Sequence, residues 1–550
     1  MGRVLPDLAL ARSRGDSLLS ILRRSARARP DAPALLTEGL TLSRRELVER
    51  IDARAGWLRA RDTQEGDRVT IVGCPSAEYV AWLLACSSVG ATAVLTSDAL
   101  SASYLRRLLE LVPSKLLLAS HEGAARLGAH SGVTDYESEA MTQALSSSGV
   151  PAPSAGPRAA GRDFACIFSS GTTGPARPSF ISEERALFVA TIFAHLVHRI
   201  HRADRLYCCL PLHHASGLLL GLGVCLVGEV PLILRERFSA RGFFDDVRRH
   251  DATIALYIGE LGRALLAQPH HDLDRQHSLR LLVGNGMGRA TWEQLRERFG
   301  IADIAEFYAA TEFPGAIVNL TGKLGSVGHV PLERLRGYRL IRLDDADEVA
   351  RGPDGFAEEP PPSEPGELVM KVPGPSSKAS VGESRILRDL FRKGDAYVRS
   401  GDLFRRDRDG YYWFVDRLGD AYRFNGELVS THDVEELCER HGAPGVSIVG
   451  VRVPGIEGKV GLAAWVRGSL ELSRFESAIA ALPSFARPRF VRLIAELELG
   501  ESFKIRKRRY AEEGADPSRV ADPLYWVTNG RCEPLSAETW ARIANGSLRL

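Results

Sequence analysis

Short apolar runs alternate with amphipathic stretches over the first 330 residues of the chain. Residues 68–73, RVTIVG, have the pattern of a buried strand, and residues 76–90, SAEYVAWLLACSSVG, have the pattern of a helix. The alternation continues through RLYCCLPL, TIALYIG, RLLVGNG and DIAEFYAATE. It is typical of parallel sheets covered by helices on both faces. We therefore predict an α/β fold that binds ligands at the carboxyl ends of its strands.

One apolar run, residues 216–234, raises the question of a membrane span. Glu229 and Pro231 interrupt it, and its apolar part is shorter than the roughly 20 residues that a spanning helix needs. We expect a buried helix that leads into a strand. The first 16 residues contain no long apolar core before their charges, so we expect no signal peptide.

The pattern changes beyond residue 345. Residues 344–367 are acidic and rich in proline and glycine, which predicts an irregular surface segment. Short strands and helices follow, including a helix over THDVEELCER capped by Ser430 or Thr431. The chain is thus expected to form a large α/β domain of parallel sheets, residues 1–416, and a small α+β domain, residues 417–550, with the boundary near Asp416 to Gly419.

Bulk composition narrows the class of protein. A chain of 550 residues is too long for one core. The 71 basic and 69 acidic residues nearly cancel, so nothing indicates nucleic acid as a partner. The eight cysteines form no Cys-x-x-Cys pair and most lie in apolar runs. Free thiols in a reducing, cytoplasmic compartment are therefore expected.

The segment FACIFSSGTTGPARP contains the first candidate site. Its glycines permit close backbone approach and its hydroxyls can donate to phosphate oxygens. It is not the common lysine-containing phosphate loop, because the nearest cation is Arg177. A polar turn after a strand is the open alternative. The candidate residues are Ser169, Ser170, Gly171, Thr172, Thr173 and Gly174.

Other polar groups follow later strands. Gly284, Asn285 and Gly286 end one strand and offer bare backbone to a flat base. The segment FYAATE offers Tyr308, Thr311 and Glu312, which suit an adenine, an α-phosphate and Mg²⁺. Further along the chain, the candidates are Asp402 for a ribose diol, Arg417 near the domain boundary and Lys504 near the C-terminus.

Each of these later groups also has an ordinary interpretation. Asp402 could cap a turn, and Arg417 could form a surface ion pair. Lys504 lies beside a basic run, residues 506–509, so a solvated basic face is an alternative. That run could contact coenzyme A phosphates or anionic lipid headgroups, but we favour solvation.

In order and spacing, these segments resemble the adenylate-forming superfamily of acyl-CoA synthetases, nonribosomal adenylation domains and luciferases. The loop at 169–174 is similar to its Thr-Ser-Gly-Thr-Thr-Gly signature, FYAATE to Tyr-Gly-Ala-Thr-Glu, and SGDLF to Thr-Gly-Asp. The resemblance is closest to the fatty-acid transport protein or very-long-chain acyl-CoA synthetase family. LPLHHASG, FRKGDAYVRSGDLF, DRLGDAYRFNGELVST and YAEEGADPSRVADPLYW carry that likeness, which runs from about residue 30 to the end.

The resemblance implies a two-step reaction, in which ATP activates a carboxylate as acyl-AMP and coenzyme A then displaces AMP. It assigns catalysis to Lys504, Thr311 and Glu312, with Glu312 also holding Mg²⁺. It implies that the small domain rotates about Gly419 and Asp420. The implied ATP- and AMP-binding residues are Ser169, Ser170, Gly171, Thr172, Thr173, Gly174, Arg177, Gly284, Asn285, Gly286, Tyr308, Ala309, Thr311, Asp402 and Arg417.

The resemblance also implies sites for the other two substrates. Gly426 would leave room for the pantetheine of coenzyme A. His214 and Gly217 would line the acyl pocket, although His214 could equally be a core histidine. The apolar run 216–228 could line a tunnel for the chain.

Four positions depart from the family pattern. Arg177 replaces a lysine, Ala309 a glycine, His213 a tyrosine and Glu501 a glycine. Arginine keeps the charge but is bulkier and forked. None of these changes removes a group that the chemistry needs, so an active enzyme is expected.

Three functions are carried forward. The leading hypothesis is an ATP- and Mg²⁺-dependent ligase that joins a long- or very-long-chain fatty acid to coenzyme A. The second is a ligase that loads a carrier protein or activates a specialised acid. The third is a lipid-uptake or lipid-binding protein with weakened catalysis. A cytoplasmic location is expected, with peripheral membrane contact as an addition to it. The acyl chain length and the choice between monomer and homodimer are left open.

Overall fold

The computed structural model describes most of the chain, and it divides into two compact units. The described residues are 14–128, 132–147, 161–169, 176–309, 313, 315–344, 346–372, 385–443, 445–456, 458–466, 472–495 and 507–548. The first unit contains residues 1–171, 175–286 and 295–305, and the second contains residues 172–174, 287–294 and 306–550. Each unit is described by itself.

The first sheet of the first unit is mainly parallel and has the order β6-β5-β3-β4-β7-β8. Only β8 runs antiparallel to its neighbour. Every residue of β4 is buried, as expected for a strand covered on both faces. The strands are β3 (Arg68–Val72), β4 (Thr92–Thr96), β5 (Leu116–Ala119), β6 (Val133–Asp135), β7 (Asp163–Ser169) and β8 (Arg177–Ser182).

The second sheet of the first unit is also built around parallel strands. From β1 through β10, β9 and β11 to β12 all neighbours are parallel, and β2 closes one edge as an antiparallel strand. The chain passes from the first unit to the second along β13. The strands are β1 (Pro33–Thr37), β2 (Leu40–Ser43), β9 (Leu206–Cys208), β10 (Leu232–Leu234), β11 (Ile254–Ile258), β12 (Leu281–Asn285) and β13 (Asp303–Ala309).

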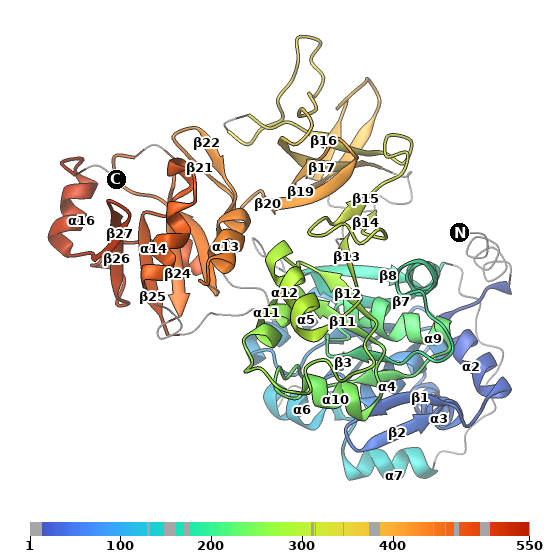
Figure 1. The fold of residues 1–550 in the computed structure, drawn as a ribbon. Coiled ribbons are helices and arrows are strands. Elements are labelled where there is room, and N and C mark those ends of the chain that lie inside the picture. The colour runs from blue at the N-terminus through green and yellow to red at the C-terminus, as the bar shows by residue number, and fades with distance from the viewer. Residues whose placement is uncertain are drawn as a thin grey trace. The chain divides into compact units, whose positions relative to one another are not determined.

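Helices surround these strands (Figure 1), and serine residues cap the N-termini of several of them. The hydroxyls of Ser43, Ser76 and Ser101 each accept the backbone N–H three residues further on. Helix α4 is buried along almost its whole length. The helices are α2 (Leu18–Ala28), α3 (Arg44–Arg59), α4 (Ala77–Val89), α5 (Ala102–Leu111), α6 (His121–Leu127), α7 (Glu139–Ser147), α8 (Glu183–Ile192), α10 (Phe243–Arg249), α11 (Gly259–Leu266) and α12 (Arg289–Phe299).

The apolar run at 216–234 forms a buried helix that leads into a strand, as predicted. Its first part, η2 (Ser216–Gly223), is a π-helix, and α9 (Val224–Gly228) continues it before β10. A second short π-helix, η1 (Phe193–Val197), extends α8. Within the described parts of the chain, no helix combines the length and apolar character needed to cross a bilayer.

The second unit contains an antiparallel sheet with the order β15-β20-β19-β17-β16, and β18 also pairs with β19. The segment predicted to be irregular, 344–367, is irregular except at its end, where residues 365–367 already belong to β17. The strands are β14 (Ala316–Val318), which pairs with β13, β15 (Gly328–His329), β16 (Tyr338–Ile341), β17 (Pro365–Lys371), β18 (Ile386–Arg388), β19 (Ala396–Arg406) and β20 (Tyr411–Arg417).

The C-terminal part of the second unit has a hydrophobic core of its own, with Trp465, Phe475 and Phe490 fully buried. Its main sheet has the order β23-β24-β25-β26-β27, beside a β21-β22 hairpin. Ser430 caps α13, as predicted. The elements are β21 (Tyr422–Phe424), β22 (Glu427–Val429), α13 (Thr431–Arg440), β23 (Val446–Val451), β24 (Val460–Val466), α14 (Leu472–Ala480), β25 (Phe490–Ile494), α15 (Lys507–Glu513), β26 (Leu524–Thr528), β27 (Arg531–Pro534) and α16 (Ala537–Ala544).

The division at 416/417 stays a prediction, because the two compact units follow a different division of the chain. All eight cysteines are free thiols, as expected.

Candidate active site

The candidate phosphate loop joins two paired strands. Strand β7 ends at Ser169, and β8 begins at Arg177, which is paired with Ser169 in the antiparallel register. The backbone therefore brings the ends of the loop together, and Arg177 is exposed at its base. The remaining loop candidates, Ser170 to Gly174, lie outside the described residues, so their roles stay predictions.

The GNG segment lies at the carboxyl end of β12, where the α/β pattern predicts a ligand. Gly284 has no room for a side chain, since a Cβ atom there would lie 2.1 Å from the carbonyl oxygen of Tyr257. The carbonyl oxygen of Gly286 would likewise be 1.9 Å from a Cβ atom on Gly259. The bare backbone of this segment thus serves close packing of the ends of β11 and β12. Binding of a base by Gly284, Asn285 and Gly286 stays a prediction.

Tyr308 and Asp402, which lie 94 residues apart in the sequence, meet in the second unit. The Tyr308 hydroxyl donates a hydrogen bond to Asp402 Oδ2 at 2.6 Å. The Tyr308 ring packs edge-on against Phe404, with 4.8 Å between ring centroids. Ala309 is exposed at the end of β13. Thr311 and Glu312 lie outside the described residues.

A β-bulge sets the position of Asp402. Glu367 is paired with Leu403 and Val369 with Arg399, so three residues, 400–402, face one residue of β17. Gly401, in the middle of the bulge, has a φ of +75°, a conformation that favours glycine. Bulges of this kind redirect side chains and often occur beside active sites. The SGD motif therefore forms a bulge in β19 that orients the Asp402 carboxylate toward Tyr308.

Arg417 lies directly opposite Asp402 on the neighbouring strand β20. Just beyond it, the Leu418 N–H donates to the Gly401 carbonyl at 2.9 Å, so the pairing continues past the bulge. Tyr308, Asp402 and Arg417 were each predicted separately from the sequence; in the structure the Tyr308 and Asp402 side chains are hydrogen-bonded, and Arg417 is placed opposite Asp402 by the strand register. We call them the Tyr308–Asp402–Arg417 cluster.

Two residues that the sequence analysis did not single out, Glu367 and Arg399, hold the bulge beside this cluster in place. Glu367 is fully buried, and its carboxylate accepts the Gly401 N–H at 3.0 Å. The same carboxylate forms a salt bridge with the Arg399 guanidinium, with contacts at 2.8 and 2.6 Å. A buried carboxylate needs such partners. The acidic character of 344–367 had suggested a surface segment, which concealed the role of its last residue.

The electrostatics of the cluster keep Tyr308 protonated. Burial and the neighbouring charge of Asp402 raise the pKa of Tyr308 well above its ordinary value. Its hydroxyl is therefore a donor, and Asp402 is the acceptor. An aromatic ring, a carboxylate and a guanidinium offer surfaces for a base, a diol and an anion respectively.

The candidates for the acyl pocket lie at the start of η2. The rings of His213 and His214 have centroids 4.5 Å apart, and burial together with His214 lowers the pKa of His213 well below its ordinary value. A Cβ atom on Gly217 would lie 2.3 Å from the Pro211 carbonyl oxygen. Gly217 thus allows close packing of η2, and its part in an acyl pocket, like that of His214, stays a prediction.

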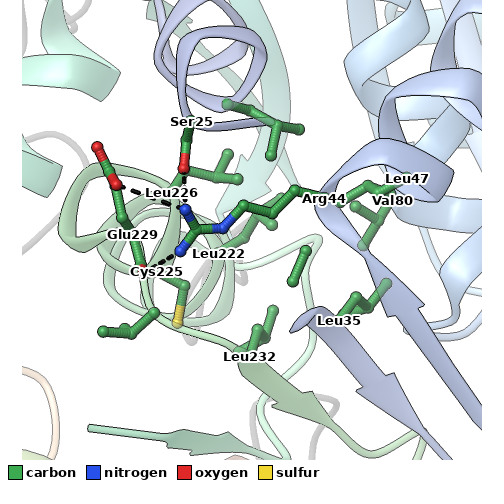
Figure 2. Close-up of a pocket in the computed structure, with 13 residues that line it drawn as sticks. Ser25, Leu35, Arg44, Leu47, Val80, Leu222, Cys225, Leu226, Glu229 and Leu232 are labelled. Atoms are coloured by element: carbon green, nitrogen blue, oxygen red, sulfur yellow. Dashed lines mark hydrogen bonds and ion pairs between the residues drawn. The ribbon is translucent and has the colours of Figure 1, made fainter. Parts of the chain in front are cut away.

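A small cavity of about 20 Å³ lies at the other end of this helix (Figure 2). Leucines and Cys225 line it, and Arg44 reaches into it from α3. The guanidinium donates to the Ser25 hydroxyl and to the Glu229 carbonyl, and lies 3.5 Å from the Glu229 carboxylate. The cavity has room for about one water molecule, and the cation already has partners. It is therefore no tunnel for an alkyl chain.

The predicted hinge and coenzyme A positions lie on two turns. Gly419 and Asp420 belong to a turn in which the Asp420 N–H donates to the Arg417 carbonyl at 3.0 Å. Asn425 and Gly426, with φ of 52° and 81°, form the two-residue turn between β21 and β22. Among the residues that the structure describes, and apart from its two chain neighbours, no atom lies within 4 Å of a Cβ atom built on Gly426. Lys504 lies outside the described residues, so its catalytic role, like the hinge and coenzyme A roles, stays a prediction.

Comparison with known proteins gives a consistent family. A family model described as AMP-binding enzyme matches residues 22–377. Long-chain fatty acid transport protein 1 of Mus musculus is 34% identical over 588 aligned positions, which cover 100% of this chain and 90% of that protein. The similarity therefore includes both compact units.

Solved structures share the fold at lower identity. The crystal structure of ATP-bound MatB from Rhodopseudomonas palustris matches with a TM-score of 0.74 and 21% identity, covering 90% of this chain and 98% of that one. An anthranilate CoA ligase in complex with anthranoyl-AMP matches with a TM-score of 0.73 and 20% identity, covering 90% of this chain and 97% of that one. These likenesses show the fold.

Proposed function

Because the chain belongs to the AMP-binding enzymes, in the branch of the long-chain fatty acid transport proteins, we propose that it is an ATP-dependent fatty acid–coenzyme A ligase. In the first step a fatty carboxylate oxygen attacks the α-phosphorus of ATP. The bond to pyrophosphate breaks, and acyl-AMP forms. In the second step the thiol sulfur of coenzyme A attacks the acyl carbon, AMP leaves, and the thiol proton passes to solvent.

The Tyr308–Asp402–Arg417 cluster is the observation that carries this proposal. Asp402 would accept the ribose hydroxyls of ATP, with Tyr308 holding the carboxylate in place by a hydrogen bond of 2.6 Å. The Tyr308 ring would face the base. Arg417, opposite Asp402 on β20, would add positive charge near the phosphate end. The fold relatives bound to ATP and to an acyl-adenylate support a nucleotide as the occupant.

The residues outside the cluster would perform the bond changes. Negative charge grows on the α-phosphate as the carboxylate attacks, so a cation placed there lowers the barrier. Lys504 would supply that cation, and the hydroxyls of the loop at 169–174 would hold phosphate oxygens. Glu312 would hold Mg²⁺. The thiol would later enter beside Gly426, after a rotation about the turn at 417–420.

A pyrophosphate-release assay across fatty acids of graded length tests the proposal directly. With ATP, Mg²⁺ and coenzyme A, the purified chain should release pyrophosphate, then AMP, and form a thioester with a long-chain acid. Absence of pyrophosphate with every acid would contradict it. Adenylate formation without turnover of free coenzyme A would instead favour a carrier protein as acceptor.

The Tyr308→Phe variant tests the cluster. Loss of the hydroxyl frees the Asp402 carboxylate, so KM for ATP should rise about tenfold, or ~1.4 kcal/mol, with KM for the acid unchanged. Tyr338→Phe is the matched control, because the Tyr338 hydroxyl donates at 3.1 Å to a backbone group, the Ala316 carbonyl, instead of a carboxylate. Equal effects of both variants on KM for ATP would contradict the assignment.

The fatty acid transport name of the relatives invites a separate test. If cells expressing Lys504→Ala retained fatty acid as well as the wild type while adenylation was lost, direct lipid binding would replace catalysis as the basis of uptake.

A further inference from the structure

The first residue of α15, Lys507, is a cation that is largely enclosed, with 18% of its side chain exposed. Its ammonium group lies 2.8 Å from Glu435 Oε1 and donates to Thr431 Oγ1 at 2.8 Å. Both partners belong to α13. The sequence had suggested that the whole basic run 506–509 is solvated, and for Lys507 that interpretation is wrong.

The partners of Lys507 are themselves held in place. Glu435 Oε1 also accepts the Ile448 N–H of β23 at 2.7 Å. Thr431 donates to Asp416 Oδ2 twice, through its backbone N–H at 2.6 Å and its hydroxyl at 2.8 Å. Asp416 is 3% exposed. The bonds therefore run in series from the Lys507 ammonium through Thr431 to Asp416.

Asp416 connects this series to the Tyr308–Asp402–Arg417 cluster. Its Oδ1 accepts the N–H of the adjacent Arg417 at 2.8 Å. Asp416 also pairs with Leu403 across β19 and β20, one position from the Asp402–Arg417 pair. A side chain at the start of α15 is thus bonded, through Thr431 alone, to Asp416 on β20, the strand that presents Arg417.

The charge balance requires a cation at this position. Burial by itself would lower the pKa of Lys507, but the carboxylates of Glu435, Asp416 and Asp420 raise it above its ordinary value. Lys507 is therefore charged, and three carboxylates face it. Removal of the cation would leave buried negative charge without its partner.

The next two cations on α15 have different surroundings. Arg508 pairs with Glu512 at 2.6 Å and Arg509 with Glu513 at 2.8 Å, each one helical turn along. The Arg508 side chain is 67% exposed and the Arg509 side chain 51% exposed. Such surface pairs contribute little. The helix thus offers an enclosed cation and an exposed one in adjacent positions.

We propose that Lys507 is a positioning residue that fixes the chain three residues after Lys504 to the Glu435–Thr431–Asp416 network. The inference rests on the proposed function, in which Lys504 acts in the first step and leaves before the second. Three residues span about 10 Å at most, so an anchor at Lys507 limits where Lys504 can reach. The first half-reaction therefore depends on the anchor, and the second does not.

Separate assays of the two half-reactions test this assignment. For Lys507→Met, pyrophosphate release should fall about thirtyfold, since small misplacements of a catalytic group are costly. Thioester formation from supplied acyl-AMP and coenzyme A should fall less than about threefold, because it needs no Lys504. Glu435→Gln should show the same asymmetry to a smaller degree. Lys507→Arg keeps the charge and should restore a large part of the first half-reaction.

Arg508→Met is the matched control, with the same charge removed from an exposed position one residue away. It should stay within about twofold of the wild type in both half-reactions. Equal losses in the two half-reactions for Lys507→Met would overturn the proposal and indicate a merely structural residue. So would a Lys507→Met variant that behaves like Arg508→Met.

Amide hydrogen exchange tests whether Lys507 holds α15 in place, and it requires no measurement of enzyme activity. In Lys507→Met the amides of α15 should exchange about tenfold faster than in the wild type, and in Arg508→Met they should not change. Unchanged exchange in Lys507→Met would overturn the anchor. A wild-type chain that releases no pyrophosphate would contradict the proposed function instead, and the exchange result would still decide whether Lys507 holds this segment.

Discussion

The parallel sheet of β3 to β7 and the antiparallel sheet of β15 to β20 differ in the regularity of their strand pairing. In β4 all five residues are buried and the pairing with β3 is unbroken. In β19 the pairing with β17 is interrupted at residues 400–402. In the regular sheet, candidate site residues lie in loops that follow the strand ends. In the irregular sheet, the candidate carboxylate of Asp402 lies within a strand, at a bulge.

This difference in regularity predicts different roles for the two sheets, one in folding stability and the other in nucleotide binding. A covered parallel strand tolerates little change, because each of its side chains fills part of a core. The interruption in β19 contributes little packing, but it turns Asp402 toward Tyr308 and brings Arg417 opposite. Substitutions in the first sheet should therefore lower the free energy of unfolding, and substitutions at the bulge should act on nucleotide binding.

The largest effect is expected at the bulge itself. Asp402→Ala removes the carboxylate from the cluster, and kcat/KM for ATP should fall about a thousandfold, or ~4 kcal/mol. Steady-state pyrophosphate release measures this loss. Asp409→Ala, in the exposed turn between β19 and β20, is the control and should change kcat/KM less than about twofold. A small loss of kcat/KM in Asp402→Ala would contradict the assignment of nucleotide binding to the bulge.

The counterpart in the first unit is Leu84→Ala on α4, where the side chain is fully buried. The cavity left behind should lower the free energy of unfolding by about 3 kcal/mol, with KM for ATP unchanged. Denaturant unfolding and steady-state kinetics measure the two quantities. Leu111→Ala, at a position that is 45% exposed, should cost less than about 1 kcal/mol. A changed KM in Leu84→Ala would show that the two regions are not separable.

Gly401→Ala distinguishes backbone strain from function. A side chain at a φ of +75° should lower the free energy of unfolding by about 1–2 kcal/mol, and the shifted bulge should raise KM for ATP about fivefold. Gly410→Ala introduces the same kind of strain at a φ of +83° in the turn after β19. It should match the stability loss with no change in KM. Equal KM values for ATP in Gly401→Ala and Gly410→Ala would mean that backbone strain, and not the orientation of Asp402, determines the affinity for ATP.

The smallest effect depends on pH and belongs to the first unit. Glu183 is 1% exposed, and burial raises its pKa, although Ser87 and Arg162 act in the opposite direction. The stability it contributes is therefore present below the unfolded pKa of about 4.5 and declines as the pH rises. Glu183→Gln cannot ionise, so its free energy of unfolding should rise relative to that of the wild type as the pH increases from 4 to 8.

Thermal unfolding across this pH range measures the gain. Glu184→Gln, at the next and exposed position of α8, should show no such trend. A gain that is flat with pH in Glu183→Gln would mean that burial does not raise the pKa of Glu183, so that the carboxyl group loses its proton equally in the folded and unfolded chain.

Local sequence signals predicted the elements well because their causes are local. Apolar alternation marked β3, β9, β11 and β12, and a serine before a helical pattern marked the cap of α13. The prediction was weaker where polar composition was taken to mean surface. Glu367 and Lys507 are charged residues in charged segments, yet one is fully buried and the other is enclosed. Composition cannot show burial, because partners distant in sequence decide it.

The sequence by itself determined the α/β alternation, the order of the motifs and the identity of Tyr308, Asp402 and Arg417 as candidates. Only the tertiary structure decided that these three lie together, since strand register and a bulge are properties of paired strands. It also decided that Lys507 differs from Arg508. The physical reason is the same in both cases, because a side chain acquires its role from groups that the fold brings to it across long stretches of chain.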